Sequence, residues 1–272
     1  MNKLFIAFVS FLVAVSVSFA DHDNLMWSPS GLPLDDHRGP WFATIDLEAT
    51  QWAWIRQSQN TRKGDTALRF EVRPGDCFTA KPHNPASGWD DCTRDRERSE
   101  IRERWLPLLD QEVWYEWSMF IPNNYEYIYP KQIFFQWHDG EGGPVVYFQL
   151  NRNNFLIDIL TKPSETTHQY KIGELPKNQW IDFTVRAVWS DRNNGNFTLW
   201  IDDQFVMEHV GPNMYPQEKL TKFGPFVKMG IYRSHLFRWK EDRPLPVQVL
   251  YFDEYRRGGS QEEVDINNHQ GD

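Results

Sequence analysis

The protein has 272 residues, of which 40% are hydrophobic and 25% are charged, a composition that excludes a disordered chain and a multi-span membrane protein. The formal net charge of −9 argues against sequence-independent nucleic-acid binding, because such binding depends on many Lys and Arg side chains neutralising phosphates. The length allows one large domain, and no linker or repeat of fixed period divides it.

The first element in chain order is a predicted signal peptide over residues 1–20. Residues 4–17 are apolar but too few to span a bilayer, Lys3 precedes them, and small residues up to Ala20 follow. This pattern predicts an exported protein, secreted or periplasmic, that has no membrane attachment after cleavage. A membrane anchor is the alternative. We expect the mature protein to be a monomer.

The mature chain consists of short alternating or apolar runs separated by turn residues, a pattern typical of β-strands. The predicted strands are residues 41–48, 67–72, 98–105, 113–120, 132–138, 145–150, 155–159, 180–189, 197–201, 204–209, 226–232 and 248–256. Asp202-Asp203 predicts a tight hairpin. Many strands with short connections favour an all-β sandwich of two antiparallel sheets. We expect this domain over residues 21–257 and a flexible polar tail over 258–272.

Two cysteines, Cys77 and Cys92, lie fifteen positions apart. In an exported chain this pair favours a disulfide, which contributes about 3 kcal/mol for a loop of this size in the chain-entropy model. A metal-binding pair is the alternative, but no further Cys or His lies at zinc spacing. The bond is predicted to hold residues 75–89 beside the arginine-rich segment that follows.

Three segments place polar side chains at alternate positions of an apolar strand. They are residues 98–102 (Arg-Ser-Glu-Ile-Arg), 134–138 (Phe-Phe-Gln-Trp-His) and 228–233 (Lys-Met-Gly-Ile-Tyr-Arg). With a side-chain period of two, the polar groups of each segment share one face. Each segment alone has an ordinary interpretation as solvated surface with weak ion pairs. Together, a cation, an amide, an imidazole and a phenol on adjacent strands suit an anionic ligand and proton transfer.

The residues Arg-Ser-Glu-Ile-Arg at 98–102, Gln-Trp-His at 136–138 and Lys-Met-Gly-Ile-Tyr at 228–232 resemble, in the same order, three signature motifs of the β-jelly-roll polysaccharide lyases. These include the alginate lyases of family 7, the glucuronan lyases of family 20 and the heparin lyase I group. Gly75-Asp76-Cys77 and the Gln-Trp-His motif are most similar to the glucuronan and heparin lyase I-like branch. The resemblance spans residues 67–257. It implies a concanavalin-like β-jelly-roll that cleaves uronate polysaccharides by β-elimination.

The resemblance also implies roles for the polar residues. Arg98 and Gln136 would neutralise the substrate carboxylate, as the dianion formed at C5 requires. Tyr232 would protonate the departing oxygen, and either His138 or Tyr232 would take the C5 proton. A nearby arginine would lower the pKa of Tyr232 and help it act as a base. Further substrate contacts are expected from Arg102, Lys228, Trp137 and Arg233.

Two other functional classes compete with this interpretation. A retaining glycosidase on the same architecture needs two carboxylates about 5 to 5.5 Å apart. The nearest candidates are Asp46 and Glu48, which lack a leading Glu because Thr44 stands there. A non-catalytic carbohydrate-binding domain would use the 13 Trp side chains to stack on sugars, but it leaves the Arg, Gln, His and Tyr set unexplained.

The expected substrate is an unsulfated β-1,4-linked glucuronan, with mannuronate-rich alginate second, because the acidic chain is unlike one adapted to highly sulfated polymers. No cofactor is expected for the elimination itself. Some jelly-roll lyases bind a structural Ca²⁺, although no spaced calcium loop is present and solvated turn carboxylates are the simpler interpretation. The carboxylates available for such an ion are Asp202, Asp203, Asp253 and Glu254.

Overall fold

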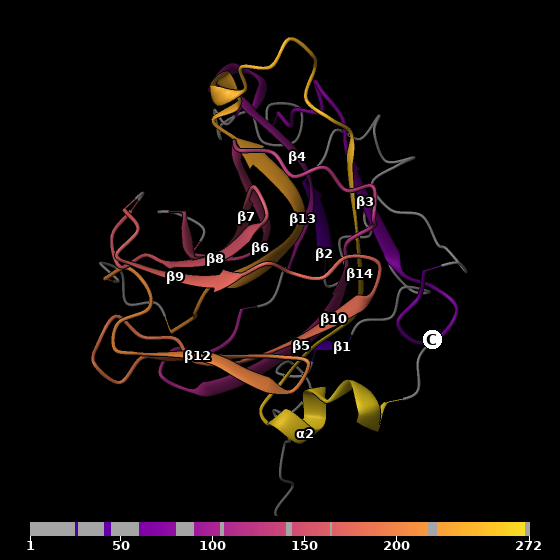
Figure 1. The fold of residues 1–272 in the computed structure, drawn as a ribbon. Coiled ribbons are helices and arrows are strands. Elements are labelled where there is room, and N and C mark those ends of the chain that lie inside the picture. The colour runs from indigo at the N-terminus through magenta and orange to yellow at the C-terminus, as the bar shows by residue number, and fades with distance from the viewer. Residues whose placement is uncertain are drawn as a thin grey trace, which may run out of the picture.

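The structure is a computed structural model that describes residues 25–26, 41–44, 60–79, 90–103, 106–139, 143–163, 165–216 and 222–269. Its strands form two seven-stranded antiparallel sheets (Figure 1). The predicted signal peptide lies outside the described residues. Within these ranges no helix is long and apolar enough to cross a membrane.

The first sheet has the strand order β1-β14-β5-β10-β11-β12, and β3 also pairs with β14. β11 and β12 are joined by Asp202 and Asp203, whose φ angles of 48° and 60° are those of a two-residue hairpin turn. The predicted hairpin is therefore confirmed. The bounds are β1 (Leu25–Met26), β3 (Leu68–Val72), β5 (Glu112–Phe120), β10 (Trp180–Val188), β11 (Asn196–Ile201), β12 (Gln204–Val210) and β14 (Gln248–Gly258).

The second sheet has the strand order β2-β4-β13-β6-β7-β8-β9. Its middle is built from β4, β13 and β6, which are distant in sequence but adjacent in the sheet. Figure 1 shows β13 as a strongly curved strand beside β6 and β4. The bounds are β2 (Trp41–Thr44), β4 (Arg96–Glu103), β6 (Lys131–His138), β7 (Pro144–Asn151), β8 (Asn154–Ile159), β9 (His168–Gly173) and β13 (Phe226–Ser234).

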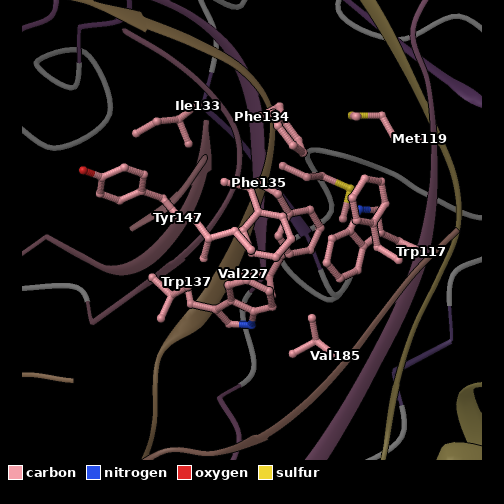
Figure 2. Close-up of a cluster of buried hydrophobic side chains, with 14 of the residues drawn as sticks. Trp117, Met119, Ile133, Phe134, Phe135, Trp137, Tyr147, Val185 and Val227 are labelled. Atoms are coloured by element: carbon pink, nitrogen blue, oxygen red, sulfur yellow. The ribbon is translucent and has the colours of Figure 1, made fainter. Parts of the chain in front are cut away.

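An aromatic core fills the space between the two sheets. The Trp117 ring of β5 stacks on Phe135 of β6, with ring centroids 3.8 Å apart, and on Phe183 of β10, with centroids 5.2 Å apart. Figure 2 shows Trp117 of the first sheet facing Phe135 and Trp137 of the second. Each buried ring of this kind contributes about 1.5 to 3 kcal/mol relative to an exposed one. Because strand side chains alternate, the same strands carry their remaining residues on the outside of the sandwich.

Each predicted strand overlaps an observed one, which confirms the all-β prediction. The sequence interpretation missed the two-residue strand β1 and also β9, the edge strand of the second sheet, which pairs with β8. For β9 the cause is visible in its burial. Its side chains are exposed or half-buried, so the apolar alternation that identified the other strands is weak there.

The predicted flexible tail is wrong for residues 258–269. Ser260 caps the short helix α2 (Gln261–Val264) by accepting a hydrogen bond from the Glu263 N–H at 3.3 Å, and the turn η5 (Ile266–Asn268) follows. Val264 and Ile266 are buried where α2 packs on β14 and β5. These two apolar side chains and the hydrogen bond from the Ile266 N–H to Glu116 of β5 hold this end of the chain on the first sheet.

Candidate active site

The three polar segments of the sequence lie on the adjacent strands β4, β13 and β6. Lys228 is opposite Arg102 on one side and Gln136 on the other, and Tyr232 is opposite Arg98. We call the surface that carries these side chains, together with Glu100 and His138, the polar face of the second sheet. The residues that alternate with them enter the core, namely Ile101, Phe135, Trp137, Met229 and Ile231.

Glu100 is the centre of the polar face. Its side chain is 1% exposed and accepts hydrogen bonds from Arg98 Nη1 at 3.0 Å, Gln136 Nε2 at 2.6 Å and Lys228 Nζ at 2.8 Å. A buried carboxylate is tolerated only when it is paired and hydrogen-bonded in this way. Glu100 therefore ties three strands together and orients Arg98, as its position on the same face of the strand predicts.

Arg98 also binds Asp91, a residue that the sequence interpretation missed. Arg98 Nη2 and Nε donate to the two carboxylate oxygens of Asp91 at 2.7 and 2.5 Å, and both side chains are buried. Burial alone would lower the pKa of Arg98, but Glu100 and Asp91 outweigh it and raise that pKa. One indication of this contact is present in the sequence, because Asp91 is next to Cys92. The predicted disulfide between Cys77 and Cys92 is present and fixes this part of the chain beside β4.

Tyr232 lies between two arginines. Its hydroxyl accepts a hydrogen bond from Arg96 Nε, and the Arg98 guanidinium lies 4.5 Å from the centre of its ring. We expected a nearby arginine to lower the pKa of Tyr232. Both arginines act in that direction, but burial outweighs them and the pKa is raised. Tyr232 is therefore a neutral phenol at neutral pH. Arg96 lies two positions before Arg98 on the same face, and the sequence interpretation gave it no role.

His138 lies partly exposed at the end of β6, and its ring stacks on Phe226 with centroids 5.3 Å apart. Burial in the protein holds the pKa of His138 well below its usual value, and the positive charges of Lys228, Arg98 and Arg102 add to this effect. The imidazole is therefore neutral at neutral pH and can accept a proton.

His138 and Tyr232 are separated along the strands. Tyr232 is opposite Ile133, five positions from His138 on β6, which corresponds to roughly 16 Å of extended strand. To act on one sugar ring, the two side chains must therefore extend toward each other across the polar face.

The remaining predicted cations of the polar face are Lys228 and Arg102. Lys228 is buried, which lowers its pKa to about 8 although its bond to Glu100 acts in the opposite direction. The Arg102 guanidinium lies 5.3 Å from the centre of the Phe226 ring. The site therefore brings several cations together on neighbouring strands. The cations are Arg96, Arg98, Arg102 and Lys228, and the carboxylates are Asp91 and Glu100.

Two predicted substrate contacts are wrong. Trp137 is 0% exposed and packs edge-on against Tyr115 in the core, with ring centroids 5.4 Å apart. Arg233 is also 0% exposed and donates to Glu97 and to the carbonyl of Pro246. Both residues alternate with the polar-face residues of their strands, so they point away from any ligand there.

Gly230 lies between Lys228 and Tyr232 on the polar face, and its missing side chain has a structural cause. A Cβ atom at this position would lie 2.1 Å from the backbone oxygen of Ser99, and the φ angle is +132°. Glycine is therefore required by the close approach of β4 and by the backbone conformation.

Two of the four proposed calcium carboxylates already bind protein donors. Asp202 accepts the Asp182 N–H at 2.9 Å, and Asp253 accepts the Arg62 N–H at 2.7 Å. Within the described part of the chain, no three His, Cys, Asp or Glu side chains are grouped to hold a metal ion. Bound calcium stays a prediction. The glycosidase candidates Asp46 and Glu48 lie outside the described residues.

Comparison with known proteins supports the same architecture. A family model described as polysaccharide lyase matches residues 38–256. The endo-β-1,4-glucuronan lyase from the fungus Trichoderma reesei is 13% identical, with a TM-score of 0.62, and the match covers 91% of this chain and 98% of that one. Alginate lyase A1-II′ of polysaccharide lyase family 7 is 12% identical, with a TM-score of 0.54, and the match covers 80% of this chain and 94% of that one. A GH131 β-glucanase catalytic domain from Podospora anserina is 9% identical, with a TM-score of 0.54, and the match covers 86% of this chain and 89% of that one.

At these identities the solved structures establish the fold alone, and they confirm the predicted β-jelly-roll class. No curated protein matches the chain.

Proposed function

Because the chain belongs to the polysaccharide lyase family, we propose that this enzyme cleaves a polyuronate by β-elimination on the polar face. The observation that carries the proposal is that Arg98, Gln136 and Lys228 converge on Glu100 in a chain whose formal net charge is −9. A polyuronate has one carboxylate on each sugar. Its binding to an acidic protein requires such a local cationic surface, because charges farther away than about 8 to 10 Å are screened at physiological salt.

The first requirement of the reaction is to stabilise the carboxylate next to C5. Removal of the C5 proton creates an enolate-like dianion, so positive charge and hydrogen-bond donors must already be in place. Gln136 uses one Nε2–H to bind Glu100, and its amide has a second N–H for the substrate carboxylate. Arg98, held by Glu100 and Asp91, supplies the adjacent fixed positive charge.

The second requirement is a base and an acid. We assign the base to neutral His138, which takes the C5 proton and leaves the enolate-like dianion. The C4–C5 double bond then forms as the C4–O4 bond breaks, and the Tyr232 phenol gives its proton to O4. The N–H of Arg96 stabilises the resulting phenolate. The His138 imidazolium then releases its proton to solvent and the Tyr232 phenolate takes one from solvent, which restores the starting state. The ligand-free protonation states of both residues support this direction.

The proposed substrate is β-1,4-linked glucuronan, with mannuronate-rich alginate second. The support is the similarity of Gly75-Asp76-Cys77 and of the Gln-Trp-His motif to the glucuronan-cleaving branch, together with the acidic net charge. We also propose that the enzyme is exported and acts as a monomer, since the N-terminal sequence has the pattern of a signal peptide and Cys77 is bonded to Cys92.

The test is a screen of glucuronan, alginate, polygalacturonate and heparin at equal uronate concentration, with absorbance near 235 nm as the readout. Only a lyase forms the conjugated 4,5-unsaturated product. The strongest rise is expected with glucuronan. A clear preference for polymannuronate would overturn the substrate assignment and leave the elimination intact. New reducing ends without absorbance would indicate hydrolysis and overturn the elimination itself.

A further inference from the structure

A second feature of the polar side of the second sheet is an open pocket of about 240 Å³. It is lined by residues of β6, β7, β8 and β9 and by the turn η4 (Leu236–Arg238) that follows β13. The strand register connects it to the site. Gln136 on β6 is opposite Tyr147 on β7, which is opposite Asp158 on β8, which is opposite Gln169 on β9. The pocket is therefore a continuation of the face that carries the proposed reaction.

The carboxylate of the pocket is already bound by amides of the protein. Asp158 is 1% exposed, and its two oxygens accept hydrogen bonds from Gln149 Nε2 and, at 2.8 Å, from Gln169 Nε2. A buried carboxylate held in this way is a fixed part of the pocket wall. Recognition of a ligand then depends on the donors that surround it.

Lys131 is the cation best placed to act as such a donor. Its Nζ donates to the Tyr147 hydroxyl at 2.5 Å, and an ammonium group has three N–H donors. Figure 2 shows that this hydroxyl points away from the aromatic core. The exposed side chains of His235 and Arg238 also line the pocket. Lys131 and Arg238 together outnumber Asp158, so the pocket has an excess of positive charge.

We propose that this pocket is a distal subsite, in which Lys131 binds the carboxylate of a uronate beyond the two sugars that flank the cleaved bond. The inference rests on the proposed lyase function and extends it to the length of chain that the enzyme recognises. Adjacent strands are about 4.8 Å apart, and a 1,4-linked pyranose advances a polysaccharide by a similar distance. A chain bound at β4, β13 and β6 therefore reaches the pocket within a few sugars.

The experiment measures kcat/KM on trimers and on hexamers of the polyuronate that the absorbance screen identifies. For the native enzyme we expect the hexamer value to exceed the trimer value by about tenfold or more, the effect of one charge-assisted hydrogen bond. Lys131→Met should reduce this ratio about tenfold, and Lys131→Arg should keep most of it. A ratio within one variant does not depend on how much of the protein is folded.

The matched control is Lys162→Met, which removes the same charge from an exposed side chain paired with exposed Glu165. Its ratio should equal that of the native enzyme. An unchanged ratio in Lys131→Met, or a native ratio near one, would overturn the subsite. So would an equal loss of rate on trimers and hexamers, since that places Lys131 at the reaction centre or in the fold. Failure of the lyase function itself is distinct, because the native enzyme would then produce no absorbance.

Discussion

The two faces of the second sheet are made by the same strands and are held together by opposite means. Toward the core, aromatic rings such as Phe135 and Trp137 pack without charge. On the polar face, Glu100, Arg98 and Asp91 form a buried ionic network. Replacing a buried ion pair by packed hydrophobic residues is often neutral or stabilising, so such a network is weak evidence for stability. From this difference we infer that the aromatic packing of the core face stabilises the fold, whereas the ionic network of the polar face serves the chemistry.

The largest expected effect tests the core side of this comparison. Trp137→Ala should lower the free energy of unfolding by about 3 to 5 kcal/mol, because it removes a fully buried indole from the aromatic core. Urea denaturation measures the change. Trp137→Phe, which retains part of the packing, should have an unchanged KM. A raised KM in that variant would restore Trp137 as a substrate contact.

On the polar face a substitution should lower the reaction rate strongly and the stability only slightly. Tyr232→Phe should lower kcat at least about a hundredfold, the low end for a lost general acid, and shift the melting temperature only slightly because the ring still packs. Initial rates near 235 nm and thermal unfolding measure the two effects separately. Near-normal turnover would remove Tyr232 from the mechanism.

The alkaline side of the pH profile should depend on Lys228. Its pKa of about 8 means that the ammonium is charged below that pH and loses its charge above it, so kcat/KM on a polyuronate should fall as the pH rises through 8. In Lys228→Arg the charge persists, and the fall should move to higher pH. Profiles of both enzymes between pH 6 and 10 decide the matter, and superimposable profiles would assign the fall to another group.

The smallest effect concerns a buried acid outside the polar face. Burial raises the pKa of Glu116 on β5 to about 8, so its contribution to stability is complete below pH 4.5 and is lost as the pH rises to 8. Glu116→Gln mimics the protonated acid. We expect its melting temperature, relative to the native enzyme, to be a few degrees higher at pH 8 than at pH 4. The same difference at both values would mean that folding does not raise the pKa of Glu116.

The sequence predicted the composition of the polar face better than its contacts. Strand periodicity is a local property, so it was sufficient to place Arg98, Gln136, His138 and Tyr232 on one side of the sheet. The same periodicity places Trp137 on the core side of its strand. Its assignment as a substrate contact followed only from its position in the Gln-Trp-His motif. Periodicity contains no information on register, and register determines which groups meet Glu100.

The residues that were missed depend on tertiary structure. Asp91 reaches Arg98 from a turn outside the strands, and Val264 and Ile266 find their partners on β5 and β14. No local sequence pattern indicates either contact. Arg96 was within reach of the periodicity argument, because it lies two positions before Arg98, but its bond to Tyr232 required the pairing of β4 with β13.

The Cys77–Cys92 bond has a consequence for how the enzyme is produced. Each cysteine follows an aspartate that contacts Arg98, since the Asp76 carbonyl accepts the Arg98 N–H at 2.8 Å and the Asp91 carboxylate binds its guanidinium. Protein made in a reducing cytosol would keep its aromatic core but lose the covalent link between these two anchors. Its specific activity would then report the oxidation history of the preparation, while its circular dichroism would look normal.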